Sequence, residues 1–171
     1  MINNDPHIHQ MIICANVFVR DGERYLLLKR SAKKKRAPWY IHPIGGKVDS
    51  DEDPLQAAQR ELLEEADITV SNIALKAVIT EIRPIQWEDE NRLIFRFPWD
   101  YNGEQVIDCE EGEFLWLTKR EIVQQKLFPS LDPIIEQILD STIWTIFTTY
   151  KYAWHECNAT QIYYQECVIK S

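Results

Sequence analysis

The strongest constraint on this chain is a run of acidic residues within one short stretch, residues 46–68. Glu61, Glu64 and Glu65 lie three and four residues apart, so on a helix they share about one third of the circumference. Like charges at this spacing repel each other by about 0.2–0.5 kcal/mol per pair, and anions in the last turns oppose the helix dipole. The sequence therefore predicts a compensating cation, and carboxylate oxygens favour Mg²⁺ or Mn²⁺.

The residues around these glutamates predict a helix that begins after Asp53. Asp53 suits the N-cap, Pro54 suits the first helical position, and Gln56 completes the spacing of a capping box. An apolar stripe at helical spacing is formed by Leu55, Ala58, Leu62 and Ala66. We expect this stripe to face the core, the glutamates to face a site, and Asp67 and Ile68 to end the helix.

The spacing of these residues resembles the Nudix box. That box is Gly, five residues, Glu, seven residues, Arg-Glu-aliphatic, one residue, Glu-Glu, one residue, Gly and an aliphatic residue. The positions that match are Gly46, Glu52, Arg60, Glu61, Leu62, Glu64, Glu65 and Ile68. Asp67 replaces the final glycine, and Asp tolerates the left-handed conformation that ends many helices. The alternative interpretation is a solvated acidic helix face.

The resemblance implies both a fold and a chemistry. Nudix hydrolases have an α/β fold, an α/β/α sandwich with a mixed β-sheet, and hydrolyse a nucleoside diphosphate linked to another group. Metal ions held by carboxylates neutralise charge on phosphate oxygens and activate water. We therefore expect Mg²⁺, or Mn²⁺, as the cofactor and a small nucleotide as the substrate.

The resemblance also implies roles for individual residues. Arg60 orients Glu64, Glu52 anchors Arg60, and Glu61, Glu64 and Glu65 are all candidates for the base. The catalytic set is thus Glu61, Glu64, Arg60 and Glu52. The expected metal ligands are the carbonyl of Gly45 and the carboxylates of Glu61, Glu64, Glu65 and Glu111, with Glu113 as second choice for the last. The alternative for the acidic run that contains Glu111 and Glu113 is a solvated turn. The expected substrate-binding residues are Arg30, Trp39, Gly46 and Asp132.

The substrate is the least constrained part of this prediction. The chain resembles the MutT branch, which cleaves nucleoside triphosphates, oxidised purines among them, to monophosphate and pyrophosphate. Residues 128–133 resemble the segment where that branch reads the base, with Asp132 as the reader. Residues 26–31 resemble the start of a coenzyme A-cleaving signature, but its ending is missing. ADP-ribose and dinucleotide polyphosphates are further alternatives, and a non-catalytic nucleotide sensor is an alternative of another class.

Apolar and alternating runs predict the remaining secondary structure. Strands are expected at 11–20, 24–30, 70–83, 92–98 and 113–118. Short helices are expected at 119–125 and 129–139. Asp21 and Gly22 indicate a hairpin between the first two strands. Trp39 either stacks on a base or packs in the core. Four basic residues, 33–36, either contact substrate phosphates or form a solvated loop.

The resemblance covers residues 11–140, which we expect to form the Nudix domain after a polar N-terminal segment, residues 1–10. Residues 141–171 are rich in Trp, Tyr, Thr and Ile, which favours β-structure but carries no motif. We expect this extension of the domain to be a lid, an added pair of strands or a dimer surface. A homodimer is therefore one option.

Composition narrows the partners and the compartment. A length of 171 residues suits one domain, and a net charge of −8 argues against a nucleic-acid polymer as partner. The apolar run after the N-terminal segment is too short for a signal peptide or a membrane span. The four cysteines form no C-x-x-C pair and no dense disulfide pattern, which predicts reduced thiols and a cytoplasmic protein.

Overall fold

The computed structural model describes residues 11–34, 37–70, 73–82, 92–103, 106, 110–128, 131–155 and 158–170. The expected N-terminal segment, residues 1–10, lies outside the described residues. So do two of the four basic residues, Lys35 and Arg36, and the first residues of the helix expected at 129–139. Among the described residues, no helix is long and apolar enough to cross a membrane.

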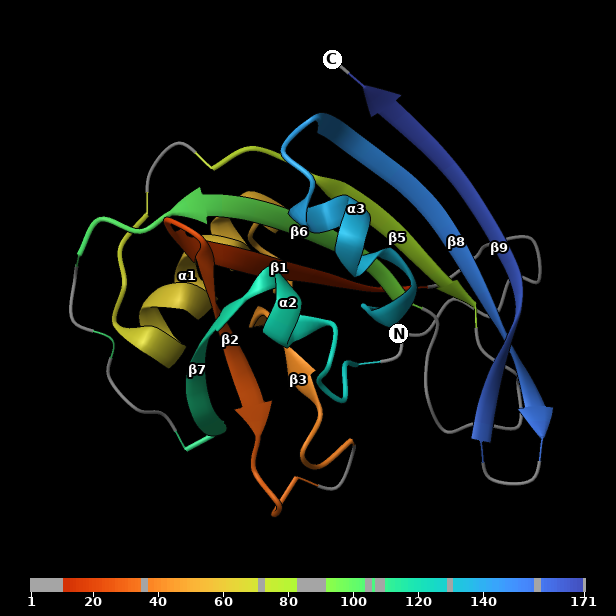
Figure 1. Cartoon of the computed structure of the whole chain (residues 1–171), viewed down its shortest axis with the longest axis horizontal. Coiled ribbons are helices and arrows are strands. Elements are labelled where there is room, and N and C mark those ends of the chain that lie inside the picture. The colour runs from red at the N-terminus through yellow and green to blue at the C-terminus, as the bar shows by residue number, and fades with distance from the viewer. Residues whose placement is uncertain are drawn as a thin grey trace.

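A single mixed sheet of nine strands forms the centre of the molecule (Figure 1). Its strands are β1 (Ile12–Asp21), β2 (Arg24–Arg30), β3 (Ile41–His42), β4 (Ile44–Lys47), β5 (Ala77–Ile82), β6 (Arg92–Asp100), β7 (Gly112–Thr118), β8 (Ile143–His155) and β9 (Asn158–Lys170). Their order is β3-β2-β1-β6-β5-β8-β9, while β4 pairs with β1 and β7 with β2. β1 with β6 and β5 with β8 are parallel, and the other pairs are antiparallel, so the predicted mixed sheet is confirmed.

β1 has different partners along its two halves. Residues 14–17 pair with β4, whereas residues 19–21 pair with β2, and β6 runs along the opposite edge of both halves. The predicted hairpin follows β1, where Gly22 has a φ of 58° at the first position of a two-residue turn. Glycine favours this position because it adopts positive φ at little cost. The pairing with β4 brings that strand's two glycines against the backbone of β1.

Helices cover both faces of the sheet, and alternate residues of β1 show which face is which. Val17 and Val19 pack with α1 (Pro54–Ala66) in one buried cluster. Phe18 points to the other face and packs in a second cluster. The elements of that second layer are α2 (Lys119–Ile122), the 3₁₀ helix η1 (Asp132–Ile134) and α3 (Ile135–Leu139). The predicted α/β/α sandwich is therefore confirmed.

The helix expected to follow Asp53 is α1, and both of its ends agree with the prediction. The Asp53 carboxylate accepts hydrogen bonds from the backbone N–H groups of Leu55 and Gln56, at 2.8 and 2.9 Å. The Gln56 side chain accepts one from the Asp53 N–H at 2.9 Å, which completes the capping box. Asp67 takes the left-handed conformation with φ 56° and ψ 34°. The prediction for Leu55 is wrong: it is 38% exposed in the first turn, and Ala57 is buried instead.

Three predicted elements are shorter than expected. The strand predicted at 70–83 is β5, which begins at Ala77, because Val70 is held beside α1 by a hydrogen bond from Gln59 Nε2 to its carbonyl at 3.1 Å. The helix predicted at 129–139 is divided into η1 and α3, and Pro133 lies in the first turn, where its missing N–H costs no helical hydrogen bond. The helix predicted at 119–125 ends at Ile122 and continues as turns with bonds between residues three apart.

The residues after Asp140 form the strands β8 and β9. β8 lies parallel to β5, and β9 pairs antiparallel with β8 at the edge of the sheet. Figure 1 shows this long hairpin, in blue, running along the side of the sheet away from α1.

We expect Asp53→Ala to lower the free energy of unfolding by about 0.5–2 kcal/mol, because two N–H groups at the start of α1 lose their acceptor. Urea denaturation followed by circular dichroism measures this. Asp51→Ala, an exposed carboxylate in the preceding loop, is the matched control, with a change within about 0.5 kcal/mol. Equal losses in the two variants would contradict the capping role.

Candidate active site

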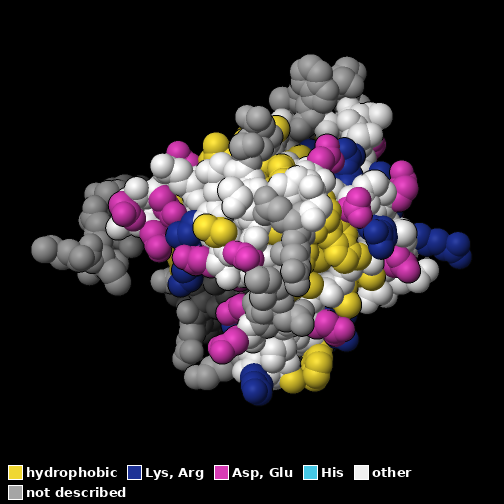
Figure 2. Space-filling model, turned by 90° about the vertical axis from the view of Figure 1, so that its left-hand side faces the viewer, with side chains coloured by type: hydrophobic (Ala, Val, Ile, Leu, Met, Phe, Trp, Pro, Cys, Tyr) yellow, Lys and Arg dark blue, Asp and Glu magenta, His cyan; other side chains and the backbone are white. Residues whose placement is uncertain are grey.

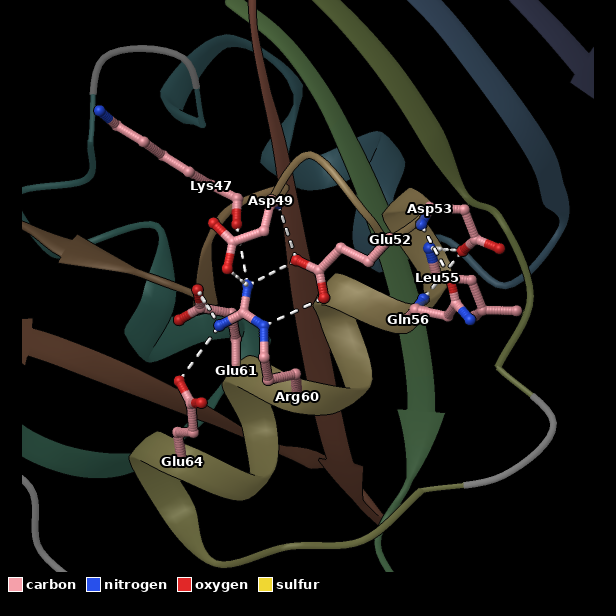
Figure 3. Close-up of polar contacts among 9 residues, drawn as sticks. All are labelled: Lys47, Asp49, Glu52, Asp53, Leu55, Gln56, Arg60, Glu61 and Glu64. Atoms are coloured by element: carbon pink, nitrogen blue, oxygen red, sulfur yellow. Dashed lines mark hydrogen bonds and ion pairs between the residues drawn. The ribbon is translucent and has the colours of Figure 1, made fainter.

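Arg60 of α1 is surrounded by carboxylates (Figure 3). Its Nε and Nη2 donate to the two oxygens of Glu52, at 3.0 and 2.7 Å. Its Nη1 donates to Glu61 at 2.9 Å and to Glu64 at 3.1 Å, and Nη2 also donates to the carbonyl of Lys47 at 3.1 Å. One guanidinium thus joins the loop before α1 to two glutamates on the helix.

This arrangement changes the charge balance of the helix. The hydrogen bond from Arg60 holds the pKa of Glu52 below its usual range, and the same bond is the main cause of the raised pKa of Arg60. Fork-to-fork pairing of guanidinium with carboxylate is the strongest common form of this contact. Arg60 therefore offsets part of the repulsion between Glu61 and Glu64 that the sequence predicts.

Two glycines bring the backbone of β4 against the glutamates of α1. The N–H of Gly45 donates to Glu65 Oε2 at 3.3 Å, and Gly45 has a φ of 140°. A Cβ on Gly45 would lie 2.8 Å from the Cα of Asn16 in β1. A Cβ on Gly46 would lie 2.6 Å from the carboxylate carbon of Glu61. Gly45 needs glycine, because its φ is positive and a side chain there would displace the backbone of β1, whereas a side chain at Gly46 would displace the carboxylate of Glu61.

Burial sets the ionisation of these two glutamates. Burial raises the pKa of Glu61, against the lowering effect of Arg60. Burial, followed by the negative charge of Glu61, raises the pKa of Glu65 to about 7, although the Gly45 N–H partly offsets this. Glu111 adds a smaller repulsion. Carboxylates held together away from water are destabilised as anions, and a bound cation removes that penalty.

The donor set fits a hard divalent ion. Among the described residues, no three His, Cys, Asp or Glu side chains are already grouped closely enough to hold a metal. Glu65 nevertheless accepts from the Gly45 N–H and Glu61 lies against Gly46, so two carboxylates meet at the backbone of β4, and carboxylate oxygens suit such an ion. Glu64 differs from them: its side chain is 60% exposed and turns toward Arg60 (Figure 3).

A cavity of about 410 Å³ opens beside these carboxylates. The predicted site residues that line it are Arg30, Gly45, Gly46, Glu61, Glu65 and Glu111. Those that do not line it are Trp39, Glu52, Arg60, Glu64 and Asp132. A larger cavity, of about 680 Å³, lies around Phe18, Tyr25 and Lys76 and contains none of the predicted residues. The structure therefore gathers about half of the predicted site around one cavity.

Arg30 is fixed in the wall of this cavity by His42. Arg30 Nη1 lies 3.3 Å from His42 Nε2, and His42 Nδ1 lies 2.6 Å from the carbonyl of Pro43. Burial, and then the charge of Arg30, lowers the pKa of His42 to about 4, so the imidazole is neutral at pH 7. Its Nδ1–H donates to Pro43 and its Nε2 accepts from Arg30. The Phe128 ring packs edge-on to His42, with centroids 6.2 Å apart.

Among the described residues of the acidic loop before β7, Glu111 reaches the cavity. Glu111 lines it, its carboxylate forms an ion pair with Lys34, and its carbonyl accepts from the Ser31 N–H at 2.9 Å. Glu113, the second choice, is 68% exposed and lies 3.9 Å from Lys29 Nζ. Lys34 therefore connects the basic segment to a carboxylate of the site.

Two predicted substrate contacts lie outside the cavity wall. Trp39 has a φ of 69° and is 56% exposed, with the Lys29 amine 5.9 Å from its ring, so core packing is wrong for this residue. Asp132 is exposed at the start of η1, and its N–H donates to the carbonyl of Phe128 at 3.1 Å. Their contacts with substrate stay predictions.

The sequence analysis missed several residues of the cavity wall. Those that bear charged, amide or aromatic groups are Asn16, His42, Lys47, Glu81, Arg96 and Phe128. A signal existed for two of them: Glu81 follows Ala77 and Ile79 at alternate positions of β5, and Arg96 follows Ile94 on β6. A charge on the apolar face of a strand indicates either an ion pair or a site.

Comparison with known proteins identifies related chains. The NUDIX domain family model matches residues 11–138. The CTP pyrophosphohydrolase of Escherichia coli K12 is 30% identical over 132 residues, which cover 74% of this chain and 90% of the relative. The MutT protein of Bacillus halodurans superposes with a TM-score of 0.75 at 21% identity, over 91% of this chain and 97% of that one. That shared fold therefore extends beyond Asp140.

A third similar structure is the NUDIX domain of Shewanella oneidensis NrtR in complex with ADP ribose. Its TM-score is 0.61 at 16% identity, over 79% of this chain and 92% of that one.

We expect metal-free Glu65→Gln protein to be more stable than the wild type at pH 8. The pKa of Glu65 is about 7 in the folded protein, against 4.5 for an ordinary glutamate. Between pH 4.5 and pH 7, the Glu65 carboxyl is therefore protonated in the folded protein but ionised in the unfolded protein. Wild-type stability is therefore lost as pH rises from about 4.5 to about 7, by on the order of 1–3 kcal/mol, and the variant lacks this loss.

Urea denaturation in chelator between pH 4 and pH 8 measures the difference. Glu136→Gln, an exposed carboxylate on α3, is the control and should follow the wild type. A Glu65→Gln curve parallel to the wild-type curve over this range would show that Glu65 does not titrate as described.

Proposed function

Because this chain belongs to the Nudix family and is a MutT-like pyrophosphohydrolase acting on a nucleoside diphosphate derivative, we propose that it cleaves a nucleoside triphosphate to the monophosphate and pyrophosphate, with Mg²⁺ as cofactor. One observation supports this most directly. A single cavity has the carboxylates of Glu61 and Glu65 at one part of its wall and the ring of Phe128 at another. A polyphosphate and its base need such a combination.

The metal would be held by oxygen ligands around β4 and α1. The ligands we propose are the Gly45 carbonyl and the carboxylates of Glu61, Glu64, Glu65 and Glu111. A bound divalent ion neutralises phosphate charge and lowers the pKa of water. Arg60, anchored by both oxygens of Glu52, keeps Glu61 and Glu64 at defined positions. Such support of ligands typically changes metal affinity or activity by about 10–100-fold.

The reaction consumes one water molecule. Its oxygen bonds to phosphorus, the bond from that phosphorus to the bridging oxygen breaks, and pyrophosphate leaves. The proton of the water passes to a carboxylate of the cluster, for which Glu61, Glu64 and Glu65 are the candidates. A carboxylate in an apolar environment suits this role, because its raised pKa approaches neutral pH.

Positive charge in the cavity compensates for an acidic protein. The net charge is −8, and Figure 2 shows Asp and Glu side chains spread over one face of the molecule. Beside its carboxylates, the cavity wall nevertheless contains the cations of Arg30 and Lys47. These groups support binding of an anionic nucleotide, since local rather than net charge acts at short range. Trp39 and Asp132 stay proposed contacts for parts of the substrate outside the cavity.

The E. coli relative is named for its action on CTP, and this supports a triphosphate rather than ADP-ribose as the substrate of the chain. The other candidates, ADP-ribose, coenzyme A and dinucleotide polyphosphates, share the diphosphate that the site requires. A non-catalytic sensor is disfavoured because Glu61, Glu64 and Glu65 are all present. We also propose a cytoplasmic protein, residues 11–140 as the Nudix domain and 141–171 as its extension. A homodimer stays a prediction.

We expect hydrolysis of nucleoside triphosphates to stop in chelator and to return with Mg²⁺ or Mn²⁺. Glu61→Gln should lower kcat by about a hundredfold or more, since a ligand should matter at least as much as its supporting groups. Its stability in metal-free buffer should hold or rise, because one buried negative charge is removed. Release of monophosphate and pyrophosphate, separated by ion-exchange chromatography, is the measurement.

Glu136→Gln is the control for this experiment and should keep wild-type kcat. Activity that survives in chelator, or near-normal turnover by Glu61→Gln, would contradict the metal assignment. If the protein hydrolyses ADP-ribose, coenzyme A or a dinucleotide polyphosphate but no triphosphate, the proposed substrate is wrong and the proposed metal site is not contradicted.

A further inference from the structure

Two buried charges of opposite sign line the same cavity as the catalytic carboxylates. Glu81 on β5 has no exposed surface, and Arg96 on β6 is 2% exposed. Both lie on the sheet face that carries Ile79 and Ile94, which belong to the hydrophobic cluster under α3. Neither residue belongs to the Nudix box, and the hydrolysis described above uses neither.

Placing charges at these positions is costly. Moving a carboxylate or a guanidinium from water into a protein interior carries an effective penalty of several kcal/mol per ion. Apolar residues at both positions would continue the cluster formed by their neighbours without that penalty. Buried charges of this kind often indicate a binding site, above all where they line a cavity.

The surroundings of Arg96 place it at the cavity wall rather than at the surface. Its strand partner in β1 is Asn16, which also lines the cavity. Its guanidinium carbon lies 5.8 Å from the centre of the Phe18 ring. Its charge contributes to the lowered pKa of His42, so the two groups are within electrostatic range. The wall therefore presents a cation, an anion, an amide and a neutral imidazole to whatever enters.

We propose that Arg96 and Glu81 read the nucleobase, and that they select bases carrying both a ring carbonyl and an exocyclic amine, namely cytosine and guanine. This rests on the proposed function and extends it by naming the class of base. Phe128, in the same wall, supplies an aromatic surface against which such a base can lie.

The selection follows from what the two side chains can do. A guanidinium only donates hydrogen bonds, and an ionised carboxylate only accepts them. Cytosine presents its amine to Glu81 and its ring nitrogen and carbonyl to Arg96. Guanine presents its amine and ring N–H to Glu81 and its carbonyl to Arg96. Adenine presents its amine to Glu81 and a ring nitrogen to Arg96, but it has no carbonyl, so Arg96 makes one hydrogen bond fewer than with cytosine. Uracil has no amine, and carbonyl oxygens flank its only ring N–H, so they repel the carboxylate of Glu81.

The test measures binding of CMP, GMP, AMP and UMP by calorimetry in chelator, so that no catalysis is needed. The wild type should bind CMP or GMP at least about tenfold more tightly than AMP and UMP, the effect of one hydrogen bond to a charged group. Glu81→Gln keeps the shape and adds an amide donor for a uracil carbonyl. It should therefore reduce the preference for CMP over UMP by about tenfold. Arg96→Met should weaken CMP and GMP more than AMP.

Glu136→Gln is the matched control and should keep the wild-type ranking. Thermal unfolding shows whether each variant is folded. If Arg96→Met does not fold, the binding preference of Glu81→Gln alone tests the proposal, because this substitution preserves side-chain volume. A wild type that binds all four monophosphates equally, or none of them, would overturn the proposal. So would Glu81→Gln protein that keeps the full preference for CMP over UMP.

The same proteins are then assayed for kcat/KM on CTP, GTP, ATP and UTP with Mg²⁺. Ranked binding without hydrolysis of any triphosphate would sink the proposed function and leave this inference standing. Hydrolysis of all four triphosphates at equal kcat/KM would leave the proposed function standing and overturn the inference. A first rank for CTP identifies cytosine as the base, a first rank for GTP identifies guanine, and either supports the reading by Arg96 and Glu81.

Discussion

The contact between two glutamates of α1 and the glycine backbone of β4 is the constraint on which the rest of the site depends. The Glu61 carboxylate lies so close to Gly46 that any side chain there would displace it, and Glu65 accepts a hydrogen bond from Gly45. This contact requires that β4 pair with β1 and that α1 pack on the same sheet. Burial of small residues such as Ala57 brings the helix close enough for that approach.

Arg60 makes this contact tolerable for a protein without bound metal. Its guanidinium meets Glu52, Glu61 and Glu64 at once, so one cation neutralises part of a cluster that would otherwise repel itself. Among the described residues, the ion pairs of Arg60 are with Asp49, Glu52, Glu61 and Glu64, and not with Glu65. Burial and the charge of Glu61 raise the pKa of Glu65, and no contact with Arg60 offsets them as it does for Glu61, so Glu65 depends most on a cation from outside.

The cavity beside these carboxylates is assembled from segments far apart in the chain. Arg30 comes from β2, Glu81 from β5, Arg96 from β6 and Glu111 from the loop before β7. They meet because β1 is central, with β2 on one side and β6 on the other. The sheet thus supplies cations and a polar wall from both of its halves to the carboxylates of α1, although the recognisable motif is confined to residues 46–68.

The sequence by itself determined the parts of this protein that depend on neighbours along the chain. The capping box at Asp53, the left-handed Asp67 and the hairpin at Gly22 all follow from local backbone preferences. Helical periodicity placed the glutamates of the box on one helix face, and the resemblance of the box to the Nudix family implied the mixed sheet between helices.

Only the tertiary structure decided which charges share a cavity. Sequence spacing put Glu64 and Glu65 on one helix face, but the path of β4 gave Glu65 to the cavity and left Glu64 toward solvent. Glu81 and Arg96 are 15 positions apart in sequence number and join the cavity through strand pairing. Val70 stayed out of the sheet because a helix side chain bonds its carbonyl. Such contacts depend on distances between remote segments, which local propensity and periodicity do not encode.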